Sequence, residues 1–300
     1  MAPPETPEKG AGEKGERIAK MIARAGVCSR REAERLIAAG RVAVDGQRLD
    51  GPAVNVTAAQ RITIDGEALP APAPPRLWRS HKPKGVIPSA HDPQGRPTVF
   101  ASLPPELGRL LSVGRLDLNS EGLLLLTNDG ALKRRLELPA SGWIRRYRAR
   151  VHGRPDPQKL AGLARGVRVD GVDYGPIRAE LERQTASNAW LKMALTEGKN
   201  REVRKVLEHL GLAVNRLIRV AYGPFQLGRL PRGALDEVPA KVLAEQLGLG
   251  GERKIGTAKA KPRPVRPGGK KPGAGKGWAK RRTGTAGKDA TKHAHRRRPS

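Results

Sequence analysis

The apolar residues between positions 16 and 66 are spaced first as helices and then as short strands. Residues 18–25 place Ile, Met, Ile and Ala at the i, i+3, i+4 and i+7 positions of one helix face, and a glycine follows. Ser29 and Glu32 have the spacing of a capping box, which predicts the start of a second helix. After that helix, alternating Val and Ile residues and two Asp-Gly pairs predict short strands joined by tight turns.

Extended segments dominate the longer region from 76 to 248. The run Leu123–Leu126 is continuously apolar, short, and bounded by turn residues, which predicts a strand buried on both faces. Residues 146–151, 177–181 and 191–195 alternate apolar and polar side chains, as strands with one buried face do. Helical spacing recurs between them, and many connections are hairpin-like. We therefore predict an α+β fold, with a small helix-helix-hairpin domain followed by a largely antiparallel mixed sheet flanked by helices.

The net charge of the chain indicates the class of partner that it binds. The 58 Lys and Arg residues outnumber the 29 Asp and Glu residues, for a formal net charge of +29 over 300 residues. Such a charge indicates a polyanionic partner, nucleic acid before a membrane surface. No run of 18 apolar residues predicts a membrane span, and residues 1–15 lack the apolar segment of a secretory signal. Cys28 is the single cysteine, which excludes an intramolecular disulfide and fits a reducing, cytoplasmic location.

The stretch from 114 to 130 has the sequence GRLDLNSEGLLLLTNDG and is the most distinctive in the chain. Arg115 and Asp117 immediately precede the predicted buried strand. A carboxylate close to apolar surface is costly unless an opposite charge accompanies it. Taken alone, the pair is compatible with a structural ion pair as well as with a catalytic carboxylate.

The complete stretch resembles the catalytic motif of the RsuA/RluB-like family of bacterial ribosomal RNA pseudouridine synthases. Ser120 stands where that family more often has Thr, so the hydroxyl is kept. The resemblance implies that Asp117 is the catalytic residue and that the reaction is the isomerisation of uridine to pseudouridine in ribosomal RNA. It also implies an enzyme without a metal or other cofactor. The sequence agrees, because it has no dinucleotide-binding or P-loop glycine motif and no histidine spacing typical of metal ligands.

Two further segments extend the resemblance. Alternation within 146–151 places Tyr147 on one face and arginines on the other. The family stacks a tyrosine at this position on the target base; the alternation alone favours a core tyrosine, so the stacking role is what the resemblance implies. In EGKNREVR, residues 197–204, we expect Asn200 to cap a helix and Arg204 to lie at the border of its apolar face, with the guanidinium reaching a cleft. The resemblance implies that Arg204 pairs with Asp117; an isolated arginine there would be solvated.

Residues 16–66 resemble the S4 RNA-binding domain. This segment holds nine Lys or Arg residues against six Asp or Glu residues, so its net charge is modest. An RNA-binding role therefore rests on the resemblance and on the clustering of cations, and the alternative is an ordinary solvated surface. In this domain we expect RNA contacts from Arg17, Lys20, Arg24, Arg30, Arg31 and Arg35. In the larger domain we expect them from Lys82, Lys84, Arg115, Arg146, Lys199 and Arg201.

The remaining segments connect and extend these two domains. Residues 1–15 are rich in Pro, Gly, Lys and Glu and are expected to be disordered, and 67–75 form a Pro/Ala linker that is expected to be stiff. Residues 76–248 then form the catalytic domain. Residues 249–300 are expected to be a disordered basic tail: its last fifty residues hold seventeen Lys or Arg residues against two acidic ones. Such a tail should bind RNA by counterion release with little sequence preference.

The sequence leaves the target of this chemistry open among several hypotheses. A basic tail of this kind resembles the large-subunit enzymes of the family more than the small-subunit ones, which favours 23S ribosomal RNA as the substrate. The alternatives are a 16S ribosomal RNA synthase, a non-catalytic RNA-binding protein of ribosome assembly, and a nucleic-acid condensing protein. We expect a monomer whose partner is ribosomal RNA or a ribosome assembly intermediate.

Overall fold

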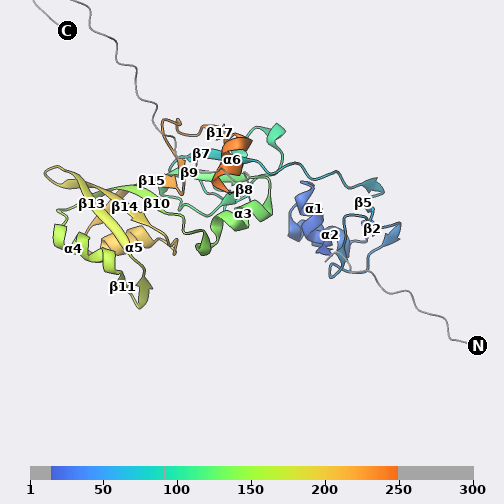
Figure 1. Ribbon diagram of the computed structural model, residues 1–300, viewed down its shortest axis with the longest axis horizontal. Helices are drawn as coiled ribbons and strands as arrows, with labels where there is room; N and C mark the ends of the chain where they lie inside the picture. The colour runs from blue at the N-terminus through green and yellow to red at the C-terminus, as the bar shows by residue number, and fades with distance from the viewer. Residues whose placement is uncertain (1–14, 91, 249–300) are drawn as a thin grey trace, which may run out of the picture. The chain divides into compact units, whose positions relative to one another are not determined.

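The computed structural model describes residues 15–90 and 92–248 (Figure 1). The expectations for the first fourteen residues and for the basic tail from 249 onward concern positions outside this range. No helix in the described range is long and apolar enough to cross a membrane.

The N-terminal domain consists of two helices and a small sheet, as the sequence predicts. Ser29 Oγ accepts a hydrogen bond from the Glu32 N–H at 3.1 Å, so Ser29 caps the second helix as predicted, while the Glu32 carboxylate pairs with Arg35. The elements of the N-terminal domain are β1 (Glu16–Arg17), α1 (Ile18–Arg24), α2 (Arg30–Ala38), β2 (Val42–Val44), β3 (Gln47–Arg48), β4 (Asn55–Val56), β5 (Ile62–Ile64) and β6 (Glu67–Ala68). Four of these strands form one sheet in the order β3-β2-β5-β6, and β1 pairs with β4.

Both predicted Asp-Gly turns are present in this domain. Asp45 and Asp65 adopt φ values of 51° and 54°, and the glycine after each has a positive φ as well. This is the backbone of a type I′ hairpin turn, which Asp-Gly pairs favour. The second turn leads into β6, which pairs with β5, so the sheet continues two residues past the boundary expected at 66.

The larger domain is built on a nine-stranded mixed sheet. Seven strands follow one another in the order β13-β14-β10-β15-β9-β7-β17, while β16 pairs with β15 and β8 pairs with β9. Every pairing in this sheet is antiparallel except β9 with β15, which is parallel. The strands are β7 (Leu77–Lys82), β8 (Leu111–Val113), β9 (Ser120–Thr127), β10 (Arg145–His152), β13 (Ile177–Gln184), β14 (Asn188–Leu195), β15 (Ala213–Tyr222), β16 (Phe225–Gln226) and β17 (Leu235–Glu237). The predicted α+β class with a largely antiparallel sheet is confirmed.

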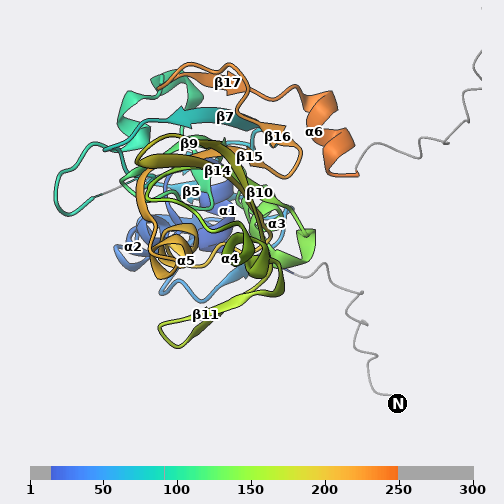
Figure 2. The same cartoon turned by 90° about the vertical axis from the view of Figure 1, so that its left-hand side faces the viewer.

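Helices cover the sheet on both faces. Leu217 and Ile218 are consecutive in β15 and belong to different hydrophobic clusters, because alternate strand residues face opposite sides. The cluster with Leu217 includes side chains of α4 (Pro157–Gly162) and α5 (Glu202–His209), and the cluster with Ile218 includes side chains of α3 (Gly130–Glu137) and α6 (Ala240–Gln246). Figure 2 shows α4 and α5 together on one side of the sheet, next to the hairpin of β11 (Val167–Val169) and β12 (Val172–Tyr174).

Strand β9 is the most deeply buried element of the sheet. All eight of its residues are buried, since it lies between β15 and β7 and has clusters on both of its faces. The sequence predicts this burial for Leu123–Leu126, and the structure extends the strand to Ser120 and Thr127. The strand cannot move without disturbing both faces of the core.

Gly122 lets β9 approach β15 closely. Its φ is 103°, and a Cβ atom built at this position would lie 2.3 Å from the backbone oxygen of Arg219 and 2.8 Å from its nitrogen. No side chain fits at these distances, and the opposing atoms belong to a backbone that is itself held in the sheet. The glycine in the EGLLLL segment is therefore required by this strand pairing.

We expect Gly122→Ala to destabilise the domain by about 3 kcal/mol or more, because the new methyl group would have to push β15 away. Gly130→Ala is the matched control: it lies in the first turn of α3, where a Cβ would have only ordinary contacts. That substitution should change stability by about 1 kcal/mol at most. Chemical denaturation of both variants measures the difference, and equal stability of the two would contradict the packing described here.

Candidate active site

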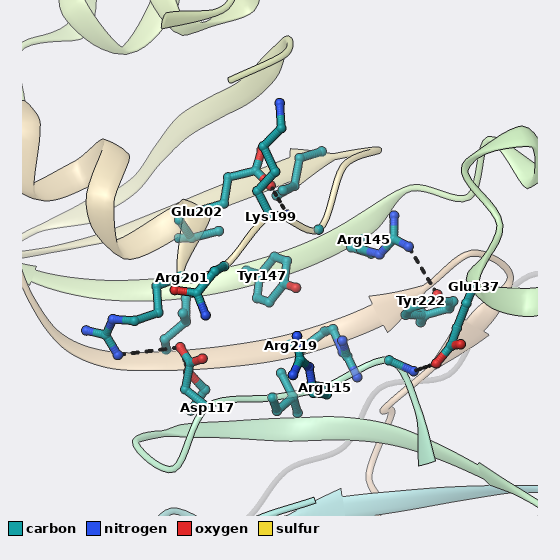
Figure 3. Close-up of a pocket in the computed structure, with 18 of the residues that line it drawn as sticks. Arg115, Asp117, Glu137, Arg145, Tyr147, Lys199, Arg201, Glu202, Arg219 and Tyr222 are labelled. Atoms are coloured by element: carbon teal, nitrogen blue, oxygen red, sulfur yellow. Dashed lines mark hydrogen bonds and ion pairs between the residues drawn. The ribbon is translucent and has the colours of Figure 1, made fainter. Parts of the chain in front are cut away.

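A cavity of about 430 Å³ lies on the face of the sheet where α5 packs (Figure 3). It is lined by the loop before β9, by β10 and β15, and by the segment that leads into α5. Its volume falls within the range of about 300–1,000 Å³ that is usual for sites that bind small molecules or a single nucleotide. The sequence-predicted residues Asp117, Tyr147, Arg115, Lys199 and Arg201 all line it.

Asp117 lies in the tight turn that enters β9. Its backbone oxygen accepts a hydrogen bond from the Ser120 N–H at 3.0 Å, and its Oδ2 lies 3.5 Å from Ser120 Oγ. Oδ2 is also 3.7 Å from Arg201 Nη1 and 4.0 Å from Arg204 Nε, and Figure 3 marks the contact with Arg201. The carboxylate therefore has two cationic neighbours and keeps 30% of its side-chain surface accessible to a ligand.

Arg204 lies beneath this loop rather than inside the cavity. Its Nη2 donates to the Asn119 backbone oxygen at 2.8 Å, and its Nη1 donates to the Val214 backbone oxygen at 3.0 Å. The predicted proximity to Asp117 is confirmed, but the expectation that the guanidinium reaches into a cleft is wrong, because the residue is buried. Burial lowers the pKa of Arg204, the neighbouring Arg201 lowers it further, and Asp117 opposes both effects. The two terminal nitrogens of the Arg204 guanidinium, its planar fork, thus connect the loop before β9 to the start of β15.

The start of α5 also differs from the prediction. Asn200 does not cap the helix; Arg201 occupies the N-cap position in a left-handed conformation, with φ at 51°. The Glu202 carboxylate reaches back and accepts a hydrogen bond from the Lys199 N–H at 2.9 Å. The Glu202 side chain thus satisfies the backbone N–H of Lys199, which precedes the helix. The turn also directs Arg201 toward Asp117.

Tyr147 and Arg219 are directly opposite each other on β10 and β15. Figure 3 shows both side chains facing the cavity, with Arg115 close by. Further along the same wall, the guanidinium groups of Arg145 and Arg219 lie 4.9 and 5.2 Å from the centre of the Tyr222 ring. The Tyr222 hydroxyl donates to the Leu136 backbone oxygen at 3.0 Å, which fixes the ring between the two cations.

The wall of the cavity carries more positive than negative charge. Three carboxylates line it: Asp117, Glu137 and Glu202. Six cationic side chains line it as well: Arg115, Lys133, Arg145, Lys199, Arg201 and Arg219. A concave site with this excess of positive charge attracts a polyanion and holds a segment of its backbone. Among the described residues, no group of three or more His, Cys, Asp or Glu side chains could hold a metal ion.

Glu202 and Arg219 are cavity residues that sequence reasoning missed. Burial raises the pKa of Glu202, and one of its carboxylate oxygens, Oε1, is buried without a hydrogen-bond partner in the described structure. In the sequence, Glu202 is one acidic residue in the charged first turn of a predicted helix, and the capping pattern accounts for an acidic residue there. Arg219 lies in an alternating strand, where a charged residue suggests a solvent-facing position. Only its place in the segment Arg216-Leu-Ile-Arg219-Val, which resembles a closing strand of the family, indicated more.

The structure contradicts the expectation that Lys82 binds RNA. Its side chain is fully buried, and its Nζ donates to the backbone oxygens of Ser120 at 2.7 Å, Pro83 at 3.0 Å and Leu118 at 3.5 Å. Burial lowers the pKa of Lys82 to about 8, against the opposing charges of Asp117 and Glu121. Lys82 therefore holds the loop that carries Asp117, from the side opposite Arg204.

The other cations expected to bind RNA remain at the surface to different degrees. In the N-terminal domain, Arg17, Arg30 and Arg31 are exposed and form no ion pair with a described carboxylate. Lys20 and Arg24 both pair with Glu16, and Arg35 pairs with Glu32 at 3.0 Å. In the larger domain, Lys84 and Arg146 are exposed, and Lys199 pairs with Glu197 at 2.9 Å.

Comparison with known proteins is consistent with both domains. Residues 77–209 match the family model described as RNA pseudouridylate synthase, and residues 16–67 match the S4 domain. The chain is 51% identical over 227 residues to an uncharacterised RNA pseudouridine synthase of Rickettsia bellii, covering 76% of this chain and 98% of that protein. It is 42% identical over 245 residues to the ribosomal large subunit pseudouridine synthase B of Yersinia pestis, covering 76% and 74%. A crystal structure of a pseudouridylate synthase superposes with a TM-score of 0.55 at 26% identity, covering 77% of this chain and 99% of that one.

The buried ammonium of Lys82 predicts a specific pH dependence of stability. Its pKa is near 8 in the folded protein and about 10.4 in the unfolded chain, so between these values the unfolded state binds more protons and this group's contribution to stability rises with pH. Lys82→Met removes this contribution. The free energy of unfolding of wild type minus that of Lys82→Met should increase by ~1–3 kcal/mol from pH 8 to 10.5 in urea titrations. Lys84→Met, at an exposed position, is the control, and a difference that stays flat with pH for both variants would contradict the burial of a charged Lys82.

Proposed function

This chain belongs to the RNA pseudouridine synthase family, and we propose that it converts uridine to pseudouridine in 23S ribosomal RNA, with Asp117 as the catalytic carboxylate. The family makes the chain an isomerase that carries an S4 RNA-binding domain. The observation that supports the site assignment is the position of Asp117, close to two arginines and in the same cationic cavity of about 430 Å³ as Tyr147.

The reaction requires a group that acts on the sugar or the base of a single nucleotide. The bond between C1′ and N1 breaks, the base turns, C1′ bonds to C5, and the proton lost from C5 is balanced by one gained at N1. No electron or atom from another reagent is needed. Asp117 supplies a carboxylate at the cavity wall. Arg201 and Arg204 place positive charge 3.7 and 4.0 Å from its Oδ2.

A uridine stacked inside RNA must leave its stack before Asp117 can reach it. Flipping a nucleotide costs a few kcal/mol, and stacking on an aromatic side chain returns about 1–3 kcal/mol. Tyr147 lines the cavity from the strand opposite Arg219 and has its ring available for this contact. We propose that Tyr147 stacks on the uracil and that Arg204 acts as a positioning residue, because it holds the loop of Asp117 without entering the cavity.

RNA affinity would come mainly from exposed cations of both domains. Arg17, Arg30 and Arg31 are free of described ion pairs, and Lys84 and Arg146 are exposed on the larger domain. Contacts of this kind bind phosphates with little sequence preference and leave base selection to the cavity. We propose that the protein works as a monomer in the cytoplasm on ribosomal RNA or a ribosome assembly intermediate. The Yersinia pestis relative is named as a large-subunit enzyme, which supports 23S ribosomal RNA over the 16S and non-catalytic alternatives.

The proposal is tested by mapping pseudouridines in ribosomal RNA from a strain without this gene, complemented with wild type or Asp117→Asn. Carbodiimide-dependent reverse-transcription stops should disappear from at least one 23S position in the deletion strain and return with wild type only. With purified protein, Asp117→Asn should convert a matching RNA fragment at less than about one thousandth of the wild-type rate, while its Kd for that fragment stays within about threefold.

Asp170→Asn serves as the matched control. Asp170 is exposed in the β11–β12 turn with a φ of 50°, a conformation that Asn adopts readily, so this variant should retain wild-type activity. Full conversion by Asp117→Asn would remove Asp117 from the chemistry. An unchanged 23S map in the deletion strain would remove 23S ribosomal RNA as the target.

A further inference from the structure

Arg219 is a buried cation without an opposite charge. Only 2% of its surface is exposed, and among the described residues it forms no ion pair with any carboxylate. Its Nε donates to the Leu123 backbone oxygen at 2.8 Å, but its Nη2 is buried and has no hydrogen-bond partner in the described structure. A buried guanidinium with an unused donor is costly, and protein cores rarely retain one without a reason.

The neighbouring carboxylates are engaged elsewhere. Asp117 lies beside Arg201 and Arg204, and Glu121 pairs with Arg216 at 2.6 Å and with Arg232 at 3.3 Å. Glu137 pairs with Lys133 at 2.6 Å and accepts from the Gly114 N–H. A partner for Arg219 therefore has to come from a molecule that enters the cavity.

The guanidinium of Arg219 is held in one orientation. The Leu123 oxygen fixes Nε, and the Tyr222 ring lies under the guanidinium carbon at 5.2 Å. The close approach of Gly122 fixes the backbone of Arg219 itself. The guanidinium is thus held in a fixed orientation at the cavity wall before a ligand binds, as in a preorganised donor.

The position of Arg219 determines which part of a bound nucleotide this side chain can contact. It is the cross-strand partner of Tyr147, and both side chains line the cavity with Asp117 (Figure 3). If Tyr147 stacks on the uracil ring, a donor adjacent to Tyr147 on the same wall faces the edge of that ring. The uracil edge presents two carbonyl oxygens, O2 and O4, which are acceptors that fit an unused guanidinium N–H donor.

We propose, on the basis of the function above, that the Arg219 guanidinium donates to a carbonyl oxygen of the target uracil. When the bond between C1′ and N1 breaks, its electron pair remains on N1 and the negative charge spreads to O2 and O4. Arg219 stabilises this charge until C5 bonds to C1′. A cation buried at a place where negative charge develops contributes more than it would in water. Arg219 is then a residue that touches the reacting base and, where the acceptor is O4, also rejects cytosine, whose C4 carries an amino group instead.

The test pairs a change in the enzyme with a change in a single substrate atom. The RNA is a fragment that the wild-type enzyme modifies, made with uridine, 2-thiouridine or 4-thiouridine at the target position, since sulfur is a weaker acceptor than oxygen. Single-turnover rates at saturating RNA are measured for wild type and Arg219→Met. Arg219→Met should lower the single-turnover rate on the uridine substrate by about 100-fold, as the loss of a preorganised donor does. Its Kd for RNA should stay within about threefold of wild type.

The two changes should not be additive. One thio substitution should slow wild type by about tenfold or more and have less than about a twofold effect on Arg219→Met, because the contact it weakens is already lost. Equal thio effects in wild type and Arg219→Met at both ring positions would overturn the proposal and leave Arg219 a structural role. Arg150→Met, an exposed arginine on β10, should keep the wild-type rate and the wild-type thio effects.

A second variant covers the case in which Arg219→Met does not fold. Arg219→Lys keeps the positive charge and the aliphatic part of the side chain but lacks the planar guanidinium with its several N–H donors. It should therefore show the same loss of the thio effect. Its folded fraction is checked by thermal melting, and rates are expressed per folded molecule. A wild-type enzyme that converts no uridine would contradict the proposed function, whereas normal wild-type turnover with additive thio effects would contradict only the role of Arg219.

Discussion

The site depends on the parallel pairing of β9 with β15. Parallel strands begin at the same edge of a sheet, so the segments that precede them lie side by side. The loop with Asp117 precedes β9, and α5 with Arg204 precedes β15, and the two strands are in register from Ser120 opposite Leu217 to Gly122 opposite Arg219. The fork of Arg204 joins the two strand starts through the Asn119 and Val214 oxygens. The position of the carboxylate thus follows from backbone geometry in the most buried part of the sheet.

Around this pairing the protein buries positive charge that nearby carboxylates neutralise only in part. Lys82, Arg204 and Arg219 are all buried, and each donates hydrogen bonds to backbone oxygens; of the three, Arg204 also lies 4.0 Å from a carboxylate, that of Asp117. Backbone oxygens satisfy some of the donors but do not cancel the charge, so the free protein bears an electrostatic cost. A phosphate backbone and a uracil that gains negative charge would each offset part of this cost. The same arrangement that lowers stability would therefore favour the substrate and its reacting form.

The sequence predicts what local patterns determine. The apolar run of β9, the helix cap at Ser29 and the hairpin turns at Asp45 and Asp65 all follow from short-range rules, and the structure confirms them. The gathering of Asp117, Tyr147 and Arg204 came instead from a resemblance over three separate segments. No spacing within one segment predicts that β9 lies parallel to β15, because that pairing joins residues about a hundred positions apart. Lys82 and Arg219 were misjudged or missed for the same reason: their partners are backbone oxygens of other strands, which sequence patterns do not reveal.

The most direct measurement is the single-turnover rate of Arg204→Lys at saturating RNA. Lysine keeps the positive charge near Asp117 but cannot join the Asn119 and Val214 oxygens with a planar fork. If the position of Asp117 depends on that junction, the rate falls by about 100-fold while the Kd for RNA and the folded fraction stay close to wild type. A rate within about threefold of wild type would contradict the account, since it would mean that Asp117 is held in place without Arg204.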